Sequence, residues 1–479
     1  MPTRRRFLLT ASAATGLAGS EHPAAAAEAE LPPAIATLSN RRTEAHPIPL
    51  AERENRLERA RALMRTQRID AIALTGGTSL DYFTGIRWRD SERLFAFVLP
   101  QKSKPFYACP AFEEDRVRER MSQAPAGRQS KIFTWQEDND PYTLVAQALR
   151  EAGVSTGKLG IEERVPFIFS DGIRKASPGL ELTSATAVTA GCRSIKSPAE
   201  LKLMQLANDV TLQVYEAAWK SLQPGMTNRQ CSDLIAAGYR QTGFAGEATC
   251  QVDAWSALPH GSLQPQIIRD DSIVLIDDGC VVEGYQSDIS RTFVLGKPTD
   301  KMRRVFDIVR QAQTAALRAA KPGVPCQAVD AAARKVVDDA GFGPAYAHFT
   351  HRLGHGIGMD EHEWPYLVKG NSRPLEPNMT TSDEPGSTCG ENSAYVSKTT
   401  CTLRWTARAR SPRKAIHWKI RLRTSGASCH AEQPWRSKRV ADFVPPWPGE
   451  GTSLATGRGD FHAGELSPID GGLEEAGNP

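Results

Sequence analysis

The chain has 479 residues, with 59 Lys and Arg, 55 Asp and Glu, and a formal net charge of +4. This length exceeds what one ordinary hydrophobic core organises, so we expect two domains and flanking tails. The near balance of charge gives no general argument for nucleic-acid or membrane-surface binding. The nine cysteines contain no C-x-x-C pair, so they suggest neither a disulfide framework nor a zinc ribbon.

Residues 1–27 have the layout of an export signal. The arginines at 4–6 precede a weakly apolar stretch that runs to about Gly19, and small residues follow at 24–27. This layout resembles a twin-arginine signal with a cleavage site near Ala27, so we expect export to the periplasm or the cell exterior. The apolar stretch is too short to span a bilayer permanently. A disordered basic tail is the alternative.

Residues 28–49 are rich in Ala, Pro and Glu and are expected to form a linker. From Leu50 to about Gln67, apolar residues recur at helical spacing. Short apolar runs then alternate with helical patterns, which is typical of an α/β domain over residues 50–194. No residue of this domain suggests chemistry of its own, so we interpret it as a scaffold. The predicted strands are Ala71–Thr75, Leu94–Leu99 and Lys158–Ile161, and the predicted helices are Phe112–Met121 and Tyr142–Ala152.

A second domain is predicted over residues 195–386. Its first helix begins after Ser197, where a serine precedes a proline, and ends before Pro224. Strand-type segments separate a first pair of helices from a second pair and follow the second pair again. The other predicted helices are Thr227–Gln241, Asp300–Ala320 and Gln327–Ala340.

The stretch Ile273–Phe293 brings two carboxylates together. The apolar run Ile273–Ile276 leads directly into Asp277, and Asp288 precedes a second strand-type run, Ser290–Val294. If the two runs pair, both carboxylates point into one pocket, where they repel each other unless a cation or a shared proton lies between them. Turn or capping carboxylates are the alternative, but the apolar flanks would then leave buried charge unpaired.

Other residues could complete the ligands of such a cation. His355 lies in L-G-H-G-I-G, His362 in D-E-H-E-W-P and Glu384 in S-D-E-P-G, while His260 lies upstream in A-L-P-H-G-S. The two aspartates with His355 and Glu384 form an oxygen-rich set with one nitrogen, which suits Mn, Co, Fe or Zn. A loop role for His260 and a helix-capping role for Glu384 are the alternatives.

The motifs I-D-D-G, S-D-I-S-R-T-F, G-H-G-I-G, H-E-W-P and S-D-E-P-G occur in this order. Together they resemble the pita-bread metallopeptidases, which include methionine aminopeptidase, aminopeptidase P and prolidase. The resemblance covers about Arg53 to Gly386. It implies an α+β fold in which a pita-bread catalytic domain follows a smaller α/β, creatinase-like N-terminal domain. Methionine aminopeptidase fits less well because it lacks a domain like Leu50–Ser194.

The resemblance also implies two divalent metal ions, Mn, Co or Zn. Asp277, Asp288, His355 and Glu384 would hold them, and Asp288 would bridge the two ions. Glu384 would in addition take a proton from the attacking water. Two ions about 3.5–4 Å apart lower the pKa of a water between them toward about 7.

The implied reaction is hydrolysis of the peptide bond between an N-terminal residue and a following proline, as in an Xaa-Pro aminopeptidase or dipeptidase. By the resemblance, His362 binds the substrate near the scissile carbonyl and His260 contacts the peptide, where both can donate to a tetrahedral oxyanion. Residues 364–366, Trp-Pro-Tyr, suit a wall for a proline ring, and core packing explains them equally well. The expected partner is a peptide with proline in second position, with no nucleic acid and no stable membrane span. The sequence does not decide whether the chain forms a homodimer.

The chain departs from the family pattern after Gly386. The family continues with a segment like I-Y-x-x-G-E-F-G-V-R-x-E-D-D, whose glutamate is the fifth metal ligand, but residues 387–401 have no carboxylate at that place. Regrouping the codons one base earlier allows Ile-Tyr at the start and Glu-Asp-Asp at the end of the missing segment. We therefore hypothesise that residues 387–479 are translated out of frame and form a disordered tail. The activity and the full metal occupancy could then be lost.

Three alternatives stay open. One is a catalytically inactive pita-bread protein that binds peptides or proteins, and another is a metal-free hydrolase of the creatinase type, which the retained carboxylates disfavour. The third concerns the tail, where residues 387–440 hold 12 Lys and Arg against two Asp and Glu. A basic nucleic-acid-binding tail would explain that excess, but the segment shows no basic helix, aromatic platform or repeat.

Overall fold

The computed structural model describes residues 30–125, 127, 130–258, 261–389, 393–396 and 399–402, with side chains through Gly386. One compact unit, Met1–Val440, contains all of them. Within these residues, no helix combines the length and the apolar character that crossing a membrane requires. The expected export signal, His260 and the residues from 403 onward lie outside the described part.

The N-terminal domain is built on a six-stranded sheet in the order β4-β3-β2-β1-β5-β6. The pairs β1–β2 and β2–β3 are antiparallel, and the other three pairs are parallel. Alternate residues of β1 face opposite sides of the sheet. Ile72 and Leu74 pack against helices on one side, whereas Ala71 and Ala73 pack against helices on the other side. The strands are β1 Ala71–Leu74, β2 Ala96–Pro100, β3 Phe106–Pro110, β4 Lys131–Trp135, β5 Gly157–Ile161 and β6 Leu180–Ser184.

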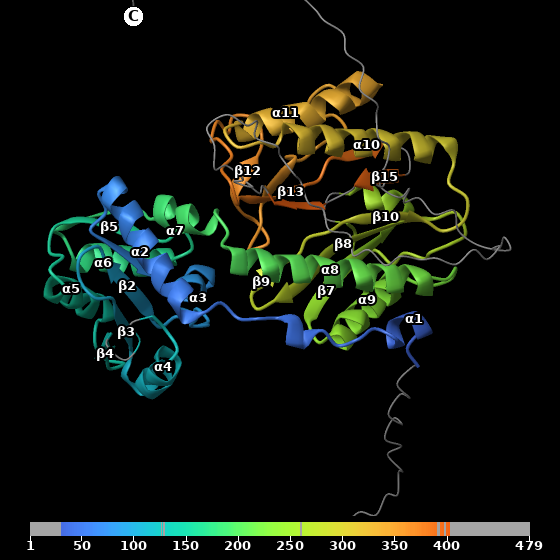
Figure 1. Ribbon diagram of the computed structural model, residues 1–479. Helices are drawn as coiled ribbons and strands as arrows, with labels where there is room; N and C mark the ends of the chain where they lie inside the picture. The colour runs from blue at the N-terminus through green and yellow to red at the C-terminus, as the bar shows by residue number, and fades with distance from the viewer. Residues whose placement is uncertain are drawn as a thin grey trace, which may run out of the picture. The chain divides into compact units, whose positions relative to one another are not determined.

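Helices cover both faces of this sheet (Figure 1). The predicted helix Leu50–Gln67 is confirmed with the same bounds as α2, and its end is marked by Arg68 in the left-handed conformation. The other two predicted helices and the three predicted strands are confirmed to within about two residues, the usual uncertainty of element ends. The helices of this domain besides α2 are α3 Thr78–Thr84, α4 Glu114–Met121, α5 Pro141–Glu151, α6 Phe167–Ala176 and α7 Thr186–Arg193. The short α1 (Pro33–Ala36) packs instead on α8 (Pro198–Ser221) and α9 (Asn228–Thr242) of the second domain.

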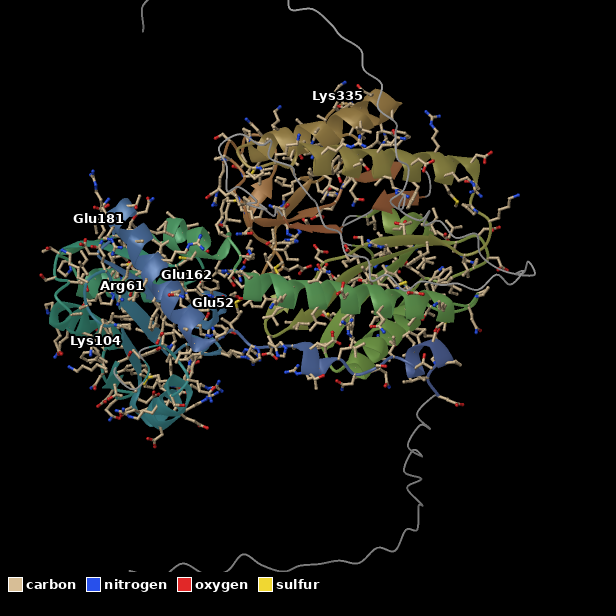
Figure 2. All side chains as sticks on the ribbon, viewed as in Figure 1. Glu52, Arg61, Lys104, Glu162, Glu181 and Lys335 are labelled. Atoms are coloured by element: carbon tan, nitrogen blue, oxygen red, sulfur yellow. The ribbon has the colours of Figure 1, made fainter. Side chains whose placement is uncertain are left out.

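Two capped helices, α8 (Pro198–Ser221) and α9 (Asn228–Thr242), open the catalytic domain. Ser197 forms a capping box with Glu200, because its Oγ accepts from the Glu200 N–H while the glutamate accepts from the Ser197 N–H. The Ser197 hydroxyl also donates to Glu52 of α2 at 2.7 Å, and Figure 2 labels that glutamate. The predicted start of this helix is therefore confirmed.

The two strand-type runs around the carboxylates pair as predicted. Strand β8 (Ile273–Val282) is antiparallel to β10 (Arg291–Val294), with Arg291 opposite Ile276. Strand β7 (Ala245–Val252) pairs with the other edge of β8, and the short β9 (Tyr285–Gln286) forms a hairpin with the end of β8. Asp288 lies between β9 and β10, while Asp277 lies within β8.

A second four-stranded sheet has the order β12-β11-β13-β16. In Figure 1 the strands β8, β10, β12 and β13 lie between α8 on one side and the helix pair α10 and α11 on the other. This order of two helices, strands, two helices and strands is the one predicted. The elements are α10 Asp300–Ala319, α11 Cys326–Val337, β11 Gly354–Gly356, β12 Glu363–Leu367, β13 Thr380–Asp383 and β16 Thr399–Thr402.

The segment after Gly386 differs from the expected disordered tail. Strands β14 (Gly386–Cys389) and β15 (Ser393–Val396) pair with each other, and β16 pairs with β13 so that Thr399 lies opposite Asp383. Strand pairing joins backbone groups, so it does not require the side chains that the family pattern has at these positions. Residues 387–402 also include four threonines, a valine and a tyrosine, which are residue types that favour strands.

Candidate metal centre

Asp288 is the most enclosed carboxylate of the candidate site. Asp288 is fully buried. The N–H of the next residue, Ile289, donates to the Asp278 carbonyl at 3.0 Å, which fixes the loop against β8. Asp277 lies on β8 itself, where its Oδ1 accepts from the Ser290 hydroxyl at 2.5 Å. Directly after it, Asp278 has a φ of +113°, which is uncommon for a residue other than glycine.

His355 and Glu384 reach the same place from the second sheet. His355 Nε2 lies 3.3 Å from Asp288 Oδ2 and 2.9 Å from Glu384 Oε1. Its Nδ1 lies 3.0 Å from the Gly356 carbonyl, which can only accept, so this nitrogen donates and Nε2 faces the two carboxylates.

The carboxylates change the titration of this imidazole. Burial by itself would lower the pKa of His355, but Asp288 and Glu384 outweigh burial and raise the pKa from 6.5 to about 9. Without a metal ion, the imidazole therefore carries a proton at neutral pH and forms an ion pair with the two carboxylates. A cation at this position would replace that proton.

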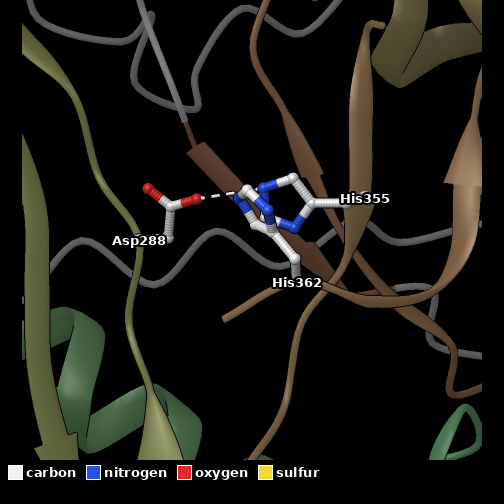
Figure 3. A group of neighbouring side chains, drawn as sticks. All are labelled: Asp288, His355 and His362. Carbon is white, nitrogen blue, oxygen red and sulfur yellow. Dashed lines mark ion pairs between the residues drawn. The ribbon is translucent and has the colours of Figure 1, made fainter. Parts of the chain in front are cut away.

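His362 lies at the exposed edge of the group. Its ring centroid is 3.9 Å from that of His355. One ligand atom each from Asp288, His355 and His362 can be chosen so that all three lie within 4.8 Å of one another (Figure 3). Both imidazoles face the Asp288 carboxylate in this view, with the exposed His362 beside the buried His355.

Strand β13, T-T-S-D, supplies supporting groups that sequence analysis missed. All four of its residues are buried although all are polar. Ser382 Oγ donates to Glu384 Oε1 at 2.5 Å and accepts from the His355 N–H at 2.9 Å, so one hydroxyl orients both residues. Gly354 is required here, because an added Cβ would lie 2.2 Å from the Ser382 carbonyl oxygen. An entirely polar strand directly before Glu384 was the sequence signal for this support.

Two further polar groups border the cluster. Burial, and then the adjacent Glu384, raise the pKa of Asp383 well above its usual range, and its buried Oδ1 has no hydrogen-bond partner among the described atoms. The pKa of Tyr215 is also raised, first by burial and then by nearby groups that include Asp277 and Asp288. The charges of Asp277 and Asp288 thus both contribute to the raised pKa of the Tyr215 phenol.

The structure brings together Asp288, His355, Glu384 and His362. Among the described residues, the group within 4.8 Å contains neither Glu384, which joins the site through His355, nor Asp277, which lies on the adjoining strand. His260 lies outside the described part of the chain. Buried carboxylates around one imidazole are a donor set that fits a hard or borderline divalent cation, and the partnerless oxygen of Asp383 shows that the polar groups here are not fully satisfied by one another.

The sequence matches two family descriptions. Residues 56–195 match the Creatinase/Prolidase N-terminal domain, and residues 202–408 match Metallopeptidase family M24. The second match extends beyond Gly386, into the strands described above. The predicted α+β fold class, with a creatinase-like N-terminal domain before a pita-bread domain, is confirmed.

Individual proteins agree with these matches. An Xaa-Pro dipeptidase of Lactobacillus delbrueckii subsp. lactis is 29% identical over 338 residues, which cover 69% of this chain and 89% of that protein. An uncharacterized peptidase of Schizosaccharomyces pombe is 31% identical over 370 residues, which cover 72% of this chain and 79% of that protein. The crystal structure of dipeptidase PepE from Mycobacterium ulcerans has a TM-score of 0.69 and 30% identity, and the match covers 75% of this chain and 95% of PepE.

Proposed function

Because the chain belongs to metallopeptidase family M24, we propose that it hydrolyses the bond between an N-terminal residue and a following proline in a metal-dependent reaction. The observation that carries this proposal is the convergence of His355 with Asp288 and Glu384, at 3.3 and 2.9 Å. The similar Xaa-Pro dipeptidase suggests the substrate class.

We propose that Asp277, Asp288, His355 and Glu384 hold the divalent ions, either Mn, Co or Zn. A bound divalent cation supplies a Lewis acid that polarises the scissile carbonyl and acidifies water at neutral pH. Burial of Asp288 and His355 excludes bulk water from this side, which strengthens the electrostatic interactions of the site.

Glu384 is proposed to accept the proton of the attacking water. Ser382 fixes one of its carboxylate oxygens, so the carboxylate is held in one orientation. His362, at the exposed edge, is proposed to donate to the oxyanion that forms on the substrate carbonyl. His260 is proposed to contact the peptide.

The proposed activity is tested by proline release. The purified full chain is incubated with an Xaa-Pro dipeptide and an Xaa-Ala dipeptide, with Mn²⁺ or with a chelator. We expect release of the C-terminal residue from the Xaa-Pro dipeptide but not from the Xaa-Ala dipeptide, only with Mn²⁺, and loss of release in Glu384→Gln. Equal release in the presence of chelator, or by Glu384→Gln, contradicts the proposal.

The departure after Gly386 favours a second candidate function, an inactive protein that binds peptides. A gene shifted by one base at the codons for Pro385 to Ser387 distinguishes the two. Higher activity in the shifted form indicates an enzyme damaged by loss of its fifth ligand. Absence of activity from both forms, with retained peptide binding, indicates the binding protein. Resequencing these codons tests the frame hypothesis itself.

Export to the periplasm or cell exterior remains a proposal based on Arg4 to Arg6 and the small residues before Glu28. Expression with and without residues 1–27, followed by fractionation, tests it. Replacing the arginines at 4 and 5 by lysine should retain the protein inside the cell. Mature protein outside the cytoplasm despite that change would contradict the proposal.

A further inference from the structure

The segment that bears His362 is attached to the N-terminal domain by ion pairs. Asp360 and Glu363 flank this segment on either side, and both are largely enclosed, with side-chain exposures of 11% and 7%. Arg193, the last residue of α7, donates through Nη2 to Asp360 Oδ2 and to Glu363 Oε2. A single guanidinium therefore joins the residues before and after His362.

Other cations and donors complete each half of this cluster. Lys196, which is buried, donates to the second oxygen of Glu363 at 2.6 Å and to the Arg193 carbonyl at 2.6 Å. Asp360 Oδ1 accepts from the Thr78 hydroxyl at 2.6 Å and from Arg164 at 3.0 Å. The donors to the Asp360 side chain thus come from α3, from the β5–α6 loop and from α7, all within the N-terminal domain.

The backbone around the cluster is tightly packed. A Cβ added to Gly358 would lie 2.5 Å from Glu363 Oε1 and 2.7 Å from Lys196 Cε, so the turn approaches the ion pair closely. The Gly358 carbonyl also accepts from the Gln286 N–H, two residues before Asp288. The turn is consequently held between the N-terminal domain and the loop of the Asp288 carboxylate.

A cavity of about 100 Å³ lies at this junction, and His362 shares its lining with Arg164, Arg193 and Trp364. His362 is exposed, unlike the buried His355, and the centroids of the two rings are 3.9 Å apart. The cluster holds residues on both sides of His362 in the sequence. Displacement of a group in an active site by about 1 Å can reduce a rate 100-fold, so this attachment matters for a residue that contacts substrate.

We propose that Arg193 is a positioning residue that holds His362 over the metal centre by bridging Asp360 and Glu363. This inference rests on the proposed function for its kinetic consequence, but the positioning itself does not require peptidase activity. It assigns the N-terminal domain a part in the chemistry, through α7.

The test compares Arg193→Lys with Arg56→Lys. Arg56 is a matched control, because it is also a buried arginine that joins the two domains, through Glu52 of α2 and Glu200 of α8, yet it does not contact Asp360 or Glu363. A lysine keeps the positive charge but presents one ammonium in place of the planar guanidinium. Both variants are checked for folding by circular dichroism.

Hydrogen exchange gives a readout that is independent of activity. We expect amides in residues 357–367 to exchange faster in Arg193→Lys than in the wild type, and to be unchanged in Arg56→Lys, with or without Mn²⁺. Equal protection of this segment in all three proteins would overturn the inference. A wild type without peptidase activity, but with the expected exchange pattern, would contradict the proposed function and leave the positioning role standing.

Kinetics separates positioning from general stability. We expect Arg193→Lys to lower kcat/KM by about 10- to 100-fold, with Mn²⁺ affinity unchanged. In a His362→Ala background, the same change should add less than about a twofold loss, because the two residues act as one unit. Full additivity of the two losses would contradict the inference.

A second variant covers the case in which Arg193→Lys does not fold. The double substitution Thr78→Val and Arg164→Gln removes two donors to Asp360 and leaves Arg193 in place. Since Arg164 is half exposed, its loss does not leave an unpaired buried charge. Faster exchange in residues 357–367 supports the proposal, and unchanged exchange overturns it.

Discussion

Strands β1 and β13 have the same length and the same complete burial but opposite chemistry. Strand β1 reads A-I-A-L in the N-terminal domain, and β13 reads T-T-S-D in the catalytic domain. Burying apolar side chains stabilises a fold, whereas burying polar ones costs free energy unless each finds a partner. Strand β1 therefore stabilises its sheet by apolar packing, whereas the polar side chains of β13 support the candidate metal ligands instead.

The partners in the two sheets follow this difference. Ile72 and Leu74 of β1 pack among apolar helix residues on one face of their sheet. Ser382 of β13 instead bonds with His355 and Glu384. Substitutions in the N-terminal domain can therefore serve as controls for substitutions around β13.

Removing a ligand should have the largest effect. His355→Ala eliminates the one nitrogen between Asp288 and Glu384 and leaves the two carboxylates to repel each other. We expect a loss of kcat/KM of more than about 100-fold, which exceeds the effect of altering a group behind a ligand. Peptidase activity with Mn²⁺ measures it, with circular dichroism as the check of folding. Retention of more than a tenth of the activity would be inconsistent with this role.

A cavity in the N-terminal sheet should affect stability alone. Ile72→Ala removes a fully buried side chain, so we expect the free energy of unfolding to fall by about 2–5 kcal/mol. Denaturant titration measures this change, and Mn²⁺ affinity of the folded protein should stay the same. Weaker Mn²⁺ binding in this variant would contradict the division between packing and ligand support.

Loss of a supporting hydroxyl should weaken the metal site moderately. Ser382→Ala removes the donor to Glu384, and we expect Mn²⁺ affinity to fall by about 10- to 100-fold. Ser79→Ala is the control, because Ser79 is also a buried serine that donates to a glutamate, Glu162, at 2.9 Å in the N-terminal domain. The two variants are compared by calorimetric titration, and equal affinities for both would rule out a special role of β13.

The smallest effect concerns pH. The pKa of His355 in the folded, metal-free protein is raised from 6.5 to about 9, so its ion pair stabilises the fold fully below pH 6.5 and this stabilisation is lost as the pH rises through 9. A metal ion needs the neutral imidazole, so binding should release about one proton at pH 7.5, and affinity should increase about tenfold per pH unit up to about pH 9. Calorimetry in buffers of different ionisation enthalpy counts the proton. No release at pH 7.5 would show that His355 is not a ligand.

Periodicity was enough to predict much of the fold. Helix α2 has apolar residues at helical spacing from Leu57 to Met64, and Ser197 precedes Pro198 at the start of α8, so local residues indicate both helices. Strands β3, β4 and β6 were not predicted. F-Y-A-C-P of β3 shows no clear alternation of apolar and polar residues, whereas L-E-L-T-S of β6 alternates but has only five residues. The strands after Gly386 were also missed, since the pairing of β14 with β15 and of β16 with β13 involves the backbone.

Some residues of the candidate site could also be predicted from the sequence, and others could not. Asp288, His355 and Glu384 could be found because each lies in a short motif with a chemical rationale. Ser382 and Arg193 could not, because each has a partner that is distant in sequence: Ser382 contacts His355, which is 27 positions away, and Arg193 contacts Glu363, which is 170 positions away. Residues that bind are visible in a sequence, whereas residues that orient them require strand pairing and domain contacts.

Asp288, His355 and Glu384 are proposed to form one cation site. Calorimetric titration of Mn²⁺ into the wild type and Asp288→Asn tests it most directly, since the substitution keeps the size of the side chain and removes only its charge. We predict saturable binding by the wild type and binding weaker by more than about 100-fold in the variant. Equal Mn²⁺ affinity in the two proteins would contradict the account.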